Sequence, residues 1–216
     1  MKRALILAGG ALNLEFAKHY IKNQSYDCLI AVDNGLKYVD LLNLLPDVIV
    51  GDFDTASSEL VAKYQEKERT KKIQLVPIKD ETDTESAVDY CIDLGYDEVV
   101  FLGAMGGRFD HTMANLHMLY RLLQHQIQGV LVDEQNIIRL LNHSITIEKS
   151  KLSANYISFL PFMEQVEGLS LKGFLYPLDK YTLKPGRSIG ISNVAVEEIC
   201  EITFEKGILI MIEAHD

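Results

Sequence analysis

A regular alternation of short apolar runs and helical patterns, from residue 3 to about 133, constrains the fold most strongly. The apolar runs expected to form strands are Ala4–Ala8, Cys28–Val32, Val48–Val50, Ile73–Val76, Glu98–Leu102 and Gly129–Val132. The helical patterns between them lie near residues 12–23, 35–43, 58–68, 83–94 and 110–126. Strands that alternate with helices in this way build a parallel sheet covered by helices. The sequence therefore predicts an α/β fold with a doubly wound, mainly parallel sheet and helices on both faces.

The pattern changes after about residue 134, where short β-prone segments are separated by turn residues and no amphipathic helix is expected. These segments are Ile145–Ile147, Tyr156–Leu160, Val166–Leu171, Ser188–Ser192, Ile199–Phe204 and Gly207–Ile212. Regularly spaced short strands favour a small antiparallel sandwich or barrel. We therefore expect an α/β domain over residues 1–134 and an all-β domain over residues 135–216. Asp133–Asn142 could belong to either one.

Composition and charge exclude several classes of function. The net charge of −10 argues against nucleic acid as a partner, because binding to its backbone requires a basic face. Cys28, Cys91 and Cys200 lie far apart within apolar runs, which is typical of buried core cysteines in a reducing compartment. The first apolar run, Ala4–Ala8, is too short for a signal peptide or a membrane span. We expect a cytoplasmic protein that binds neither nucleic acid nor membranes.

Polar, loop-forming segments follow successive predicted strands at their carboxyl ends. They are Gly9-Gly10, Asp33-Asn34-Gly35, Gly51–Thr55, Lys79–Thr84 and Gly103–His111. In an open α/β sheet, ligands bind beyond these ends. Gly9-Gly10 would let a phosphate approach the backbone, or would only form a tight turn. Asp33-Asn34-Gly35 is a strong turn signal in its own right.

Asp52 and Asp54 follow one of these strands two residues apart, so in extended chain their carboxylates point to the same side. Two such carboxylates repel each other unless a cation lies between them or one is protonated. The pair therefore indicates a hard cation, such as Mg²⁺ that holds a substrate phosphate. The alternative is a turn in which an Asp caps the following helix.

The segment from Lys79 to Glu85 combines a helix start with possible ligand groups. Thr82 and Glu85 have the spacing of a capping box that opens the helix near residue 83. Asp83 would lie in the first helical turn, where the helix dipole favours an anion, and could also complete a metal site. Lys79 suits a polyphosphate, although a solvated lysine explains it equally well.

The third polar segment contains Gly106-Gly107 followed by Arg108. The planar, five-donor guanidinium group of Arg108 suits phosphate oxygens, and the glycine pair allows a close turn beside it. Asp110 is either a functional carboxylate or the N-cap of the following helix. His111 is either a ligand or an ordinary histidine on the helix face.

These segments, in this order, resemble the motifs of the thiamine pyrophosphokinase (thiamine diphosphokinase) family in its bacterial form. Two further matching segments, Gly173–Leu178 and Ile191-Ser192-Asn193, extend the resemblance over nearly the whole chain. The resemblance implies an N-terminal α/β domain that binds ATP and Mg²⁺ and a C-terminal β-sandwich that binds thiamine. It also implies a homodimer with each thiamine site between the α/β domain of one subunit and the β domain of the other.

The resemblance also implies roles for individual residues. Asp52, Asp54 and Asp83 would hold Mg²⁺ and the pyrophosphate group. Asp33 would lie nearby, Arg108 and Asp110 would contact the nucleotide and its phosphates, and Ser192 and Asn193 would contact thiamine. With the other strand-end residues, the expected ATP-binding set is Gly9, Gly10, Asp33, Asn34, Lys79, Thr82 and Arg108. The family often has an acidic residue after the Ser-Asn pair, where this chain has Val194.

The implied reaction transfers pyrophosphate from ATP to the thiamine hydroxyl and releases AMP. Arg108 would stabilise the developing charge, and Asp83 or Asp110 would accept the hydroxyl proton. Two other functions remain possible. One is a Mg²⁺-dependent phosphatase in which Asp52, in the Asp52-Phe53-Asp54 loop, is the nucleophile. The other is a nucleotide-binding module without turnover.

Overall fold

The computed structural model describes residues 1–51, 58–65, 71–74 and 82–216. The contacts within it divide the chain into two compact units, Met1–Glu134 and Gln135–Asp216. The elements of the first unit, in chain order, are β1 (Arg3–Leu7), α1 (Leu14–Lys22), β2 (Cys28–Val32), α2 (Gly35–Leu41), β3 (Val48–Gly51), α3 (Ser58–Gln65), β4 (Lys71–Gln74), α4 (Asp83–Asp93), β5 (Glu98–Leu102), α5 (Phe109–Gln124) and β6 (Gln128–Val132).

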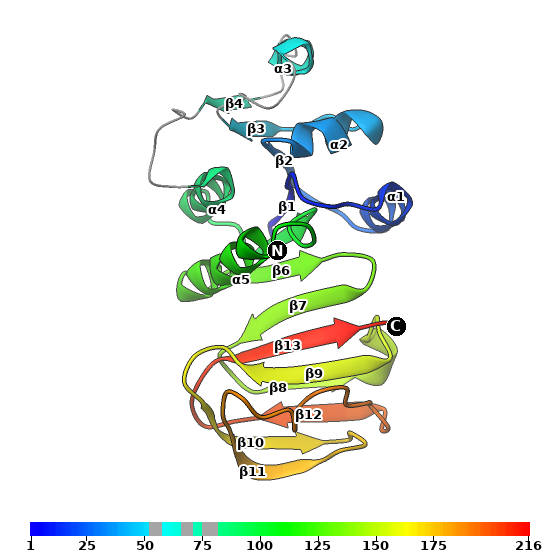
Figure 1. Ribbon diagram of the computed structural model, residues 1–216, viewed down its shortest axis with the longest axis vertical. Coiled ribbons are helices and arrows are strands. Elements are labelled where there is room, and N and C mark those ends of the chain that lie inside the picture. The colour runs from blue at the N-terminus through cyan, green and yellow to red at the C-terminus, as the bar shows by residue number, and fades with distance from the viewer. Residues whose placement is uncertain (52–57, 66–70, 75–81) are drawn as a thin grey trace. The chain divides into compact units, whose positions relative to one another are not determined.

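The strands of the first unit form a parallel sheet in the order β4-β3-β2-β1-β5-β6. Its central strands are apolar and almost completely buried, as expected for strands that are covered on both faces. Helices α1 and α2 lie on one face, and α4 and α5 lie on the other (Figure 1). The order reverses at β1, which pairs with β2 on one side and with β5 on the other. Crevices that bind ligands form at such a reversal.

The second unit consists of strands and short turns. Its elements are β7 (Asn136–Leu141), β8 (Ile145–Glu148), a 3₁₀ turn η1 (Lys149–Lys151), β9 (Tyr156–Pro161), β10 (Val166–Lys172), β11 (Leu178–Leu183), β12 (Ile199–Thr203) and β13 (Leu209–Ala214). Strands β7, β13 and β9 pair antiparallel in one layer, and β11, β10, β12 and β8 form the other. The two layers share one apolar core, in which Phe159 and Phe174 meet edge to face with ring centroids 5.5 Å apart.

The predicted fold class, a doubly wound parallel sheet followed by a β-sandwich, is confirmed. One predicted strand, Ser188–Ser192, is wrong. The Ile191 amide donates to the Ser188 carbonyl at 3.1 Å and closes a turn, and Ser192 has a φ of +53° that an extended strand does not allow. Gly173–Leu178, one of the segments that carry the family resemblance, lies almost wholly before β11, which begins at Leu178.

The three cysteines are buried and carry free thiols, as the sequence predicts. Burial raises the pKa of the Cys91 thiol to about 12, so this thiol is not reactive near neutral pH. Within the described ranges, every helix is too short or too polar to cross a membrane.

Glu213, on β13, is buried and holds two parts of the second unit together. Its Oε1 accepts from Arg139 Nη2, on β7, at 3.0 Å, and its Oε2 accepts from the backbone N–H of Ser153 at 2.9 Å. Replacing Glu213 by Ala would remove the shared acceptor of both donors and leave a void where the buried carboxylate lay. We expect Glu213→Ala to lower the free energy of unfolding by about 2 kcal/mol, measured by urea denaturation.

The exposed pair Lys172–Glu201 provides the control, with a distance of 3.2 Å between Nζ and Oε2. Glu201→Ala should change the stability by less than about 1 kcal/mol, because exposed ion pairs contribute little. Equal effects of the two substitutions would contradict the role given to Glu213.

Candidate active site

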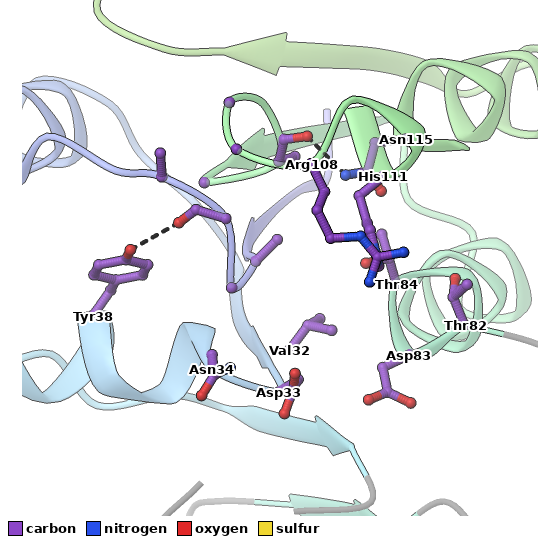
Figure 2. A pocket seen from close by; sticks show the side chains of 18 residues that line it. Val32, Asp33, Asn34, Tyr38, Thr82, Asp83, Thr84, Arg108, His111 and Asn115 are labelled. Atoms are coloured by element: carbon purple, nitrogen blue, oxygen red, sulfur yellow. Dashed lines mark hydrogen bonds between the residues drawn. The ribbon is translucent and has the colours of Figure 1, made fainter. Parts of the chain in front are cut away.

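A cavity of about 540 Å³ lies at the carboxyl ends of the parallel strands, beside the reversal of strand order at β1. Its lining residues come from the segments after β1, β2 and β5 and from the first turns of α4 and α5 (Figure 2). The predicted site residues among them are Gly9, Gly10, Asp33, Asn34, Thr82, Asp83 and Arg108. Segments that are far apart in the sequence therefore meet at one cavity, as their positions at strand ends led us to expect.

The turn after β1 is held tightly against the turn after β5. The Gly10 amide donates to the Gly103 carbonyl at 2.8 Å, and a Cβ atom on Gly10 would lie only 2.5 Å from that oxygen. A side chain at residue 10 would therefore force the two turns apart. Tyr38, one turn into α2, braces the same segment, because its hydroxyl donates to the Gly10 carbonyl at 2.8 Å (Figure 2).

Asp33 and Asp83 bring carboxylates to the cavity from β2 and α4. Asp33 has a φ of +47°, a conformation that Asp adopts more readily than most residues, and its amide donates to the Val50 carbonyl at 2.9 Å. Asp83 lies in the first turn of α4. Thr82 caps this helix, since its hydroxyl oxygen accepts from the Glu85 amide at 3.2 Å. The predicted helix start near residue 83 is confirmed with Thr82 as its cap, while the Glu85 carboxylate lies 3.4 Å from Arg121 Nη1.

The loop before α5 carries Arg108 to the mouth of the cavity. Gly106 and Gly107 both have positive φ, +82° and +75°, which gives this loop a turn that other residues adopt rarely. The Arg108 side chain is 74% exposed and makes two hydrogen bonds with Asp110, from Nε to Oδ1 at 3.1 Å and from Nη2 to Oδ2 at 2.6 Å. Figure 2 shows the guanidinium group directed over the cavity from this loop.

The alternative interpretation of Asp110 as the helix N-cap is wrong, because Arg108 occupies that position and the helix begins at Phe109. The Asp110 carboxylate accepts from the His111 amide at 2.9 Å and from Arg108. These hydrogen bonds, chiefly the one from Arg108, lower the pKa of Asp110 to about 2. His111 itself is exposed and lines the cavity.

Sequence reasoning missed the polar cavity residues Tyr38 and Asn115. Asn115 is 9% exposed and donates from Nδ2 to the Ala104 carbonyl at 2.7 Å. Asn115, Leu119 and Leu122 are the buried residues of α5. A polar residue at helical spacing from two buried leucines was therefore the available signal for Asn115.

Ser192 and Asn193 belong to the second unit. Asn193 is 1% exposed, and its carboxamide makes three local hydrogen bonds. Oδ1 accepts from the amides of Tyr176 and Val194, both at 2.9 Å, and Nδ2 donates to the Tyr176 carbonyl at 2.8 Å. Asn193 therefore fixes the backbone beside the exposed ring of Tyr176. The neighbouring Ser192 amide donates to Ser158 Oγ at 3.0 Å.

Asp52, Asp54 and Lys79, which we expected at this site, lie outside the described residues. Among the residues that are described, no group of three or more His, Cys, Asp and Glu side chains could hold a metal ion. Asp33 and Asp83 nevertheless provide hard oxygen donors at one cavity, the type of ligand that Mg²⁺ prefers.

The cavity lies at the reversal of strand order and is lined by glycine turns, an exposed arginine, carboxylates and helix N-termini. Such a combination is typical of α/β proteins that bind phosphorylated ligands. A family model described as thiamin pyrophosphokinase, catalytic domain, matches residues 17–131. A second, described as thiamin pyrophosphokinase, vitamin B1 binding domain, matches residues 142–209. The chain therefore belongs to the thiamin pyrophosphokinase family.

Individual relatives agree with this assignment. The thiamine pyrophosphokinase of Bacillus subtilis is 32% identical over 219 residues, which is 100% of both chains. A crystal structure of the B. subtilis enzyme matches with a TM-score of 0.86 and covers 100% of each chain, at 30% identity. The structure from Geobacillus thermodenitrificans matches with a TM-score of 0.83 and 28% identity, and covers 100% of this chain and 98% of the other.

The pairing of Arg108 with Asp110 gives a prediction for titration. If the guanidinium group holds the Asp110 pKa at about 2, Arg108→Gln should raise it towards about 4, the ordinary value for Asp. Carboxyl carbon shifts in an NMR pH titration would measure the change. Because the folded-state pKa lies below the unfolded one, any stability from this pair is present above pH 4 or so and is lost as the pH falls towards 2.

Arg187→Gln, which removes an exposed guanidinium group in the second unit, is the matched control and should leave the Asp110 titration unchanged. An Asp110 pKa that stays near 2 in Arg108→Gln would show that another group lowers it.

Proposed function

We propose that this chain transfers pyrophosphate from ATP to the hydroxyl group of thiamine and forms thiamine diphosphate and AMP. The observation that carries the proposal is a switch-point cavity with phosphate-binding chemistry in a chain that matches this family over its full length. A phosphatase that uses the Asp52-Phe53-Asp54 loop, or a module without turnover, is not supported by these relationships.

In this proposal the phosphates of ATP lie between the turn after β1 and the first turns of α4 and α5. Gly9 and Gly10 let the backbone approach them closely. The guanidinium group of Arg108 donates hydrogen bonds where negative charge accumulates, on the β-phosphoryl oxygens and the α–β bridging oxygen. Asn34, Thr82 and Lys79 complete the proposed set of ATP contacts.

Mg²⁺ is the proposed cofactor, held by Asp52, Asp54 and Asp83 with Asp33 nearby. When bound, it would neutralise charge on the transferred pyrophosphoryl group. The carboxylate oxygens of Asp33 and Asp83 are the type of ligand that Mg²⁺ prefers, and a cation would also offset the repulsion between a carboxylate and the phosphates. Their presence at one cavity therefore supports a cation at this site.

The thiamine hydroxyl oxygen forms a bond to the β-phosphorus while the bond from that phosphorus to the α–β bridging oxygen breaks. AMP leaves with the bridging oxygen, and the hydroxyl proton passes to a base. A carboxylate whose pKa is about 2 is a poor base, and Asp110 is already bonded to Arg108. This leaves Asp110 to orient Arg108, and Asp83 is then the other candidate proton acceptor when it is not bound to the metal.

We further propose that thiamine binds near Ser192 and Asn193. The three hydrogen bonds of the Asn193 carboxamide support an indirect role, in which Asn193 holds the backbone of Tyr176 and Val194 in place. A homodimer that completes each thiamine site is part of this proposal and rests on the family resemblance. A cytoplasmic location is also proposed, and the free, buried thiols support it.

Incubation with ATP, Mg²⁺ and thiamine, followed by nucleotide analysis, tests the reaction. We expect AMP and thiamine diphosphate in equal amounts. ADP would indicate ordinary phosphoryl transfer, and unchanged ATP would refute the proposed activity.

Asp83→Asn, which removes a charge at nearly constant shape, should lower kcat by about 100-fold or more, and Asp52→Asn should do the same. Glu59→Gln, on the exposed side of α3, is the matched control and should retain activity.

The proposed role of Asn193 predicts a selective effect on thiamine. Asn193→Ala should raise KM for thiamine several-fold and leave KM for ATP nearly unchanged, because the loop it holds is assigned to thiamine. Asn193→Asp keeps the oxygen that accepts from the amides of Tyr176 and Val194, so it should raise KM for thiamine by a smaller factor. Steady-state kinetics with each substrate varied in turn would measure this, with the exposed Asn142→Ala as control. Equal increases in both KM values would refute the selective role.

A further inference from the structure

Asn115 combines deep burial with an open position towards the cavity. It is about nine-tenths buried in the second turn of α5, and it lines the cavity together with Ala104, the residue to which it is bonded (Figure 2). The hydrogen bond from Nδ2 to the Ala104 carbonyl, 2.7 Å long, is well formed.

This hydrogen bond fixes the orientation of the carboxamide. A backbone carbonyl can only accept, so the amide nitrogen of Asn115, and not its oxygen, must face Ala104. The oxygen, Oδ1, is therefore directed away from the loop. Within the part of the chain that the structure describes, no donor is bonded to Oδ1. Among the described side chains, only Tyr26 Oη and Arg139 Nε are buried without a partner, so Oδ1 is not sealed off from solvent and opens onto the cavity. Water or a ligand in the cavity can therefore supply its donor.

The chemistry of Oδ1 restricts which part of a ligand it can meet. Phosphate oxygens only accept hydrogen bonds at neutral pH, so Oδ1 would repel them. The remainder of a nucleotide carries donors, namely the ribose hydroxyls and the adenine amino group. The cavity also has buried apolar lining at Ala8, Val32 and Ala104, which suits a nucleoside better than a polyphosphate.

We propose that Asn115 is a specificity-determining residue whose Oδ1 accepts a hydrogen bond from the nucleoside part of ATP. This inference rests on the proposed function, because it assumes that the cavity holds ATP. The donor is the adenine 6-amino group or a ribose hydroxyl. If the amino group is the donor, the 6-oxo group of guanine would place an acceptor against Oδ1 and weaken GTP binding.

Analogues of ATP that each lack one donor distinguish these sources. Dissociation constants for ATP, purine riboside triphosphate, 2′-deoxy-ATP and 3′-deoxy-ATP would be measured by calorimetry with Mg²⁺ and without thiamine. We expect one analogue to bind the native chain about fivefold to tenfold more weakly than ATP, the effect of one neutral hydrogen bond. In Asn115→Ala this preference should disappear, so that the same analogue and ATP bind within about twofold.

The comparison among analogues separates recognition from a purely structural role. If Asn115 only supports the loop at Ala104, the substitution should weaken all four ligands by the same factor, and the proposal is overturned. It is also overturned if the native chain binds all four equally. Asn115→Ser provides a smaller perturbation of the loop should Asn115→Ala not fold. Gln124→Ala removes an exposed carboxamide from the end of α5 and should keep the native preference.

Binding without thiamine also separates this inference from the proposed reaction. Formation of AMP and thiamine diphosphate with no discrimination among the analogues would refute only the role of Asn115. Discrimination that depends on Asn115, in a chain that forms no thiamine diphosphate, would refute only the proposed reaction.

Discussion

The double pairing of β1 is the constraint on which the site depends. This buried strand forms parallel ladders with β2 on one edge and with β5 on the other. Because parallel strands end at the same side of a sheet, the turns that follow them are brought together there. The Gly10 amide and the Gly103 carbonyl join two of these turns directly. The cavity follows from this register, and a shift of either ladder would separate its walls.

A second contact keeps the α4 and α5 sides of the cavity together. Arg121, on α5, donates from Nε to Asp89 on α4 at 2.7 Å, and its Nη1 lies 3.4 Å from Glu85 Oε1. Glu85 thus takes part in an ion pair between helices as well as donating its amide to the Thr82 cap. The first turns of these helices contain Asp83 and follow Arg108, so their spacing affects how both groups face the cavity.

The sequence was sufficient for features that depend on local pattern. Apolar runs located β2 and β5 at their observed bounds, and the capping signal at Thr82 located the start of α4. Ser188–Ser192 has a β-prone composition but forms a turn, because the contacts of the surrounding sandwich decide its conformation. Helical spacing marks Asn115 as a buried position, but the roles of Asn115 and Tyr38 depend on hydrogen bonds to carbonyls in other segments, and periodicity does not predict those partners.

The position of β1 also has a consequence for synthesis on the ribosome. β1 and β2 are available to pair early, but the second edge of β1 remains open until Glu98–Leu102 has left the exit tunnel. During that interval an apolar strand exposes unpaired amides and carbonyls, the kind of edge that promotes association between nascent chains. The chain closes this edge only after more than half of it has been made, because the residues still inside the tunnel all follow Leu102, so slow translation of this part would prolong the exposure of β1.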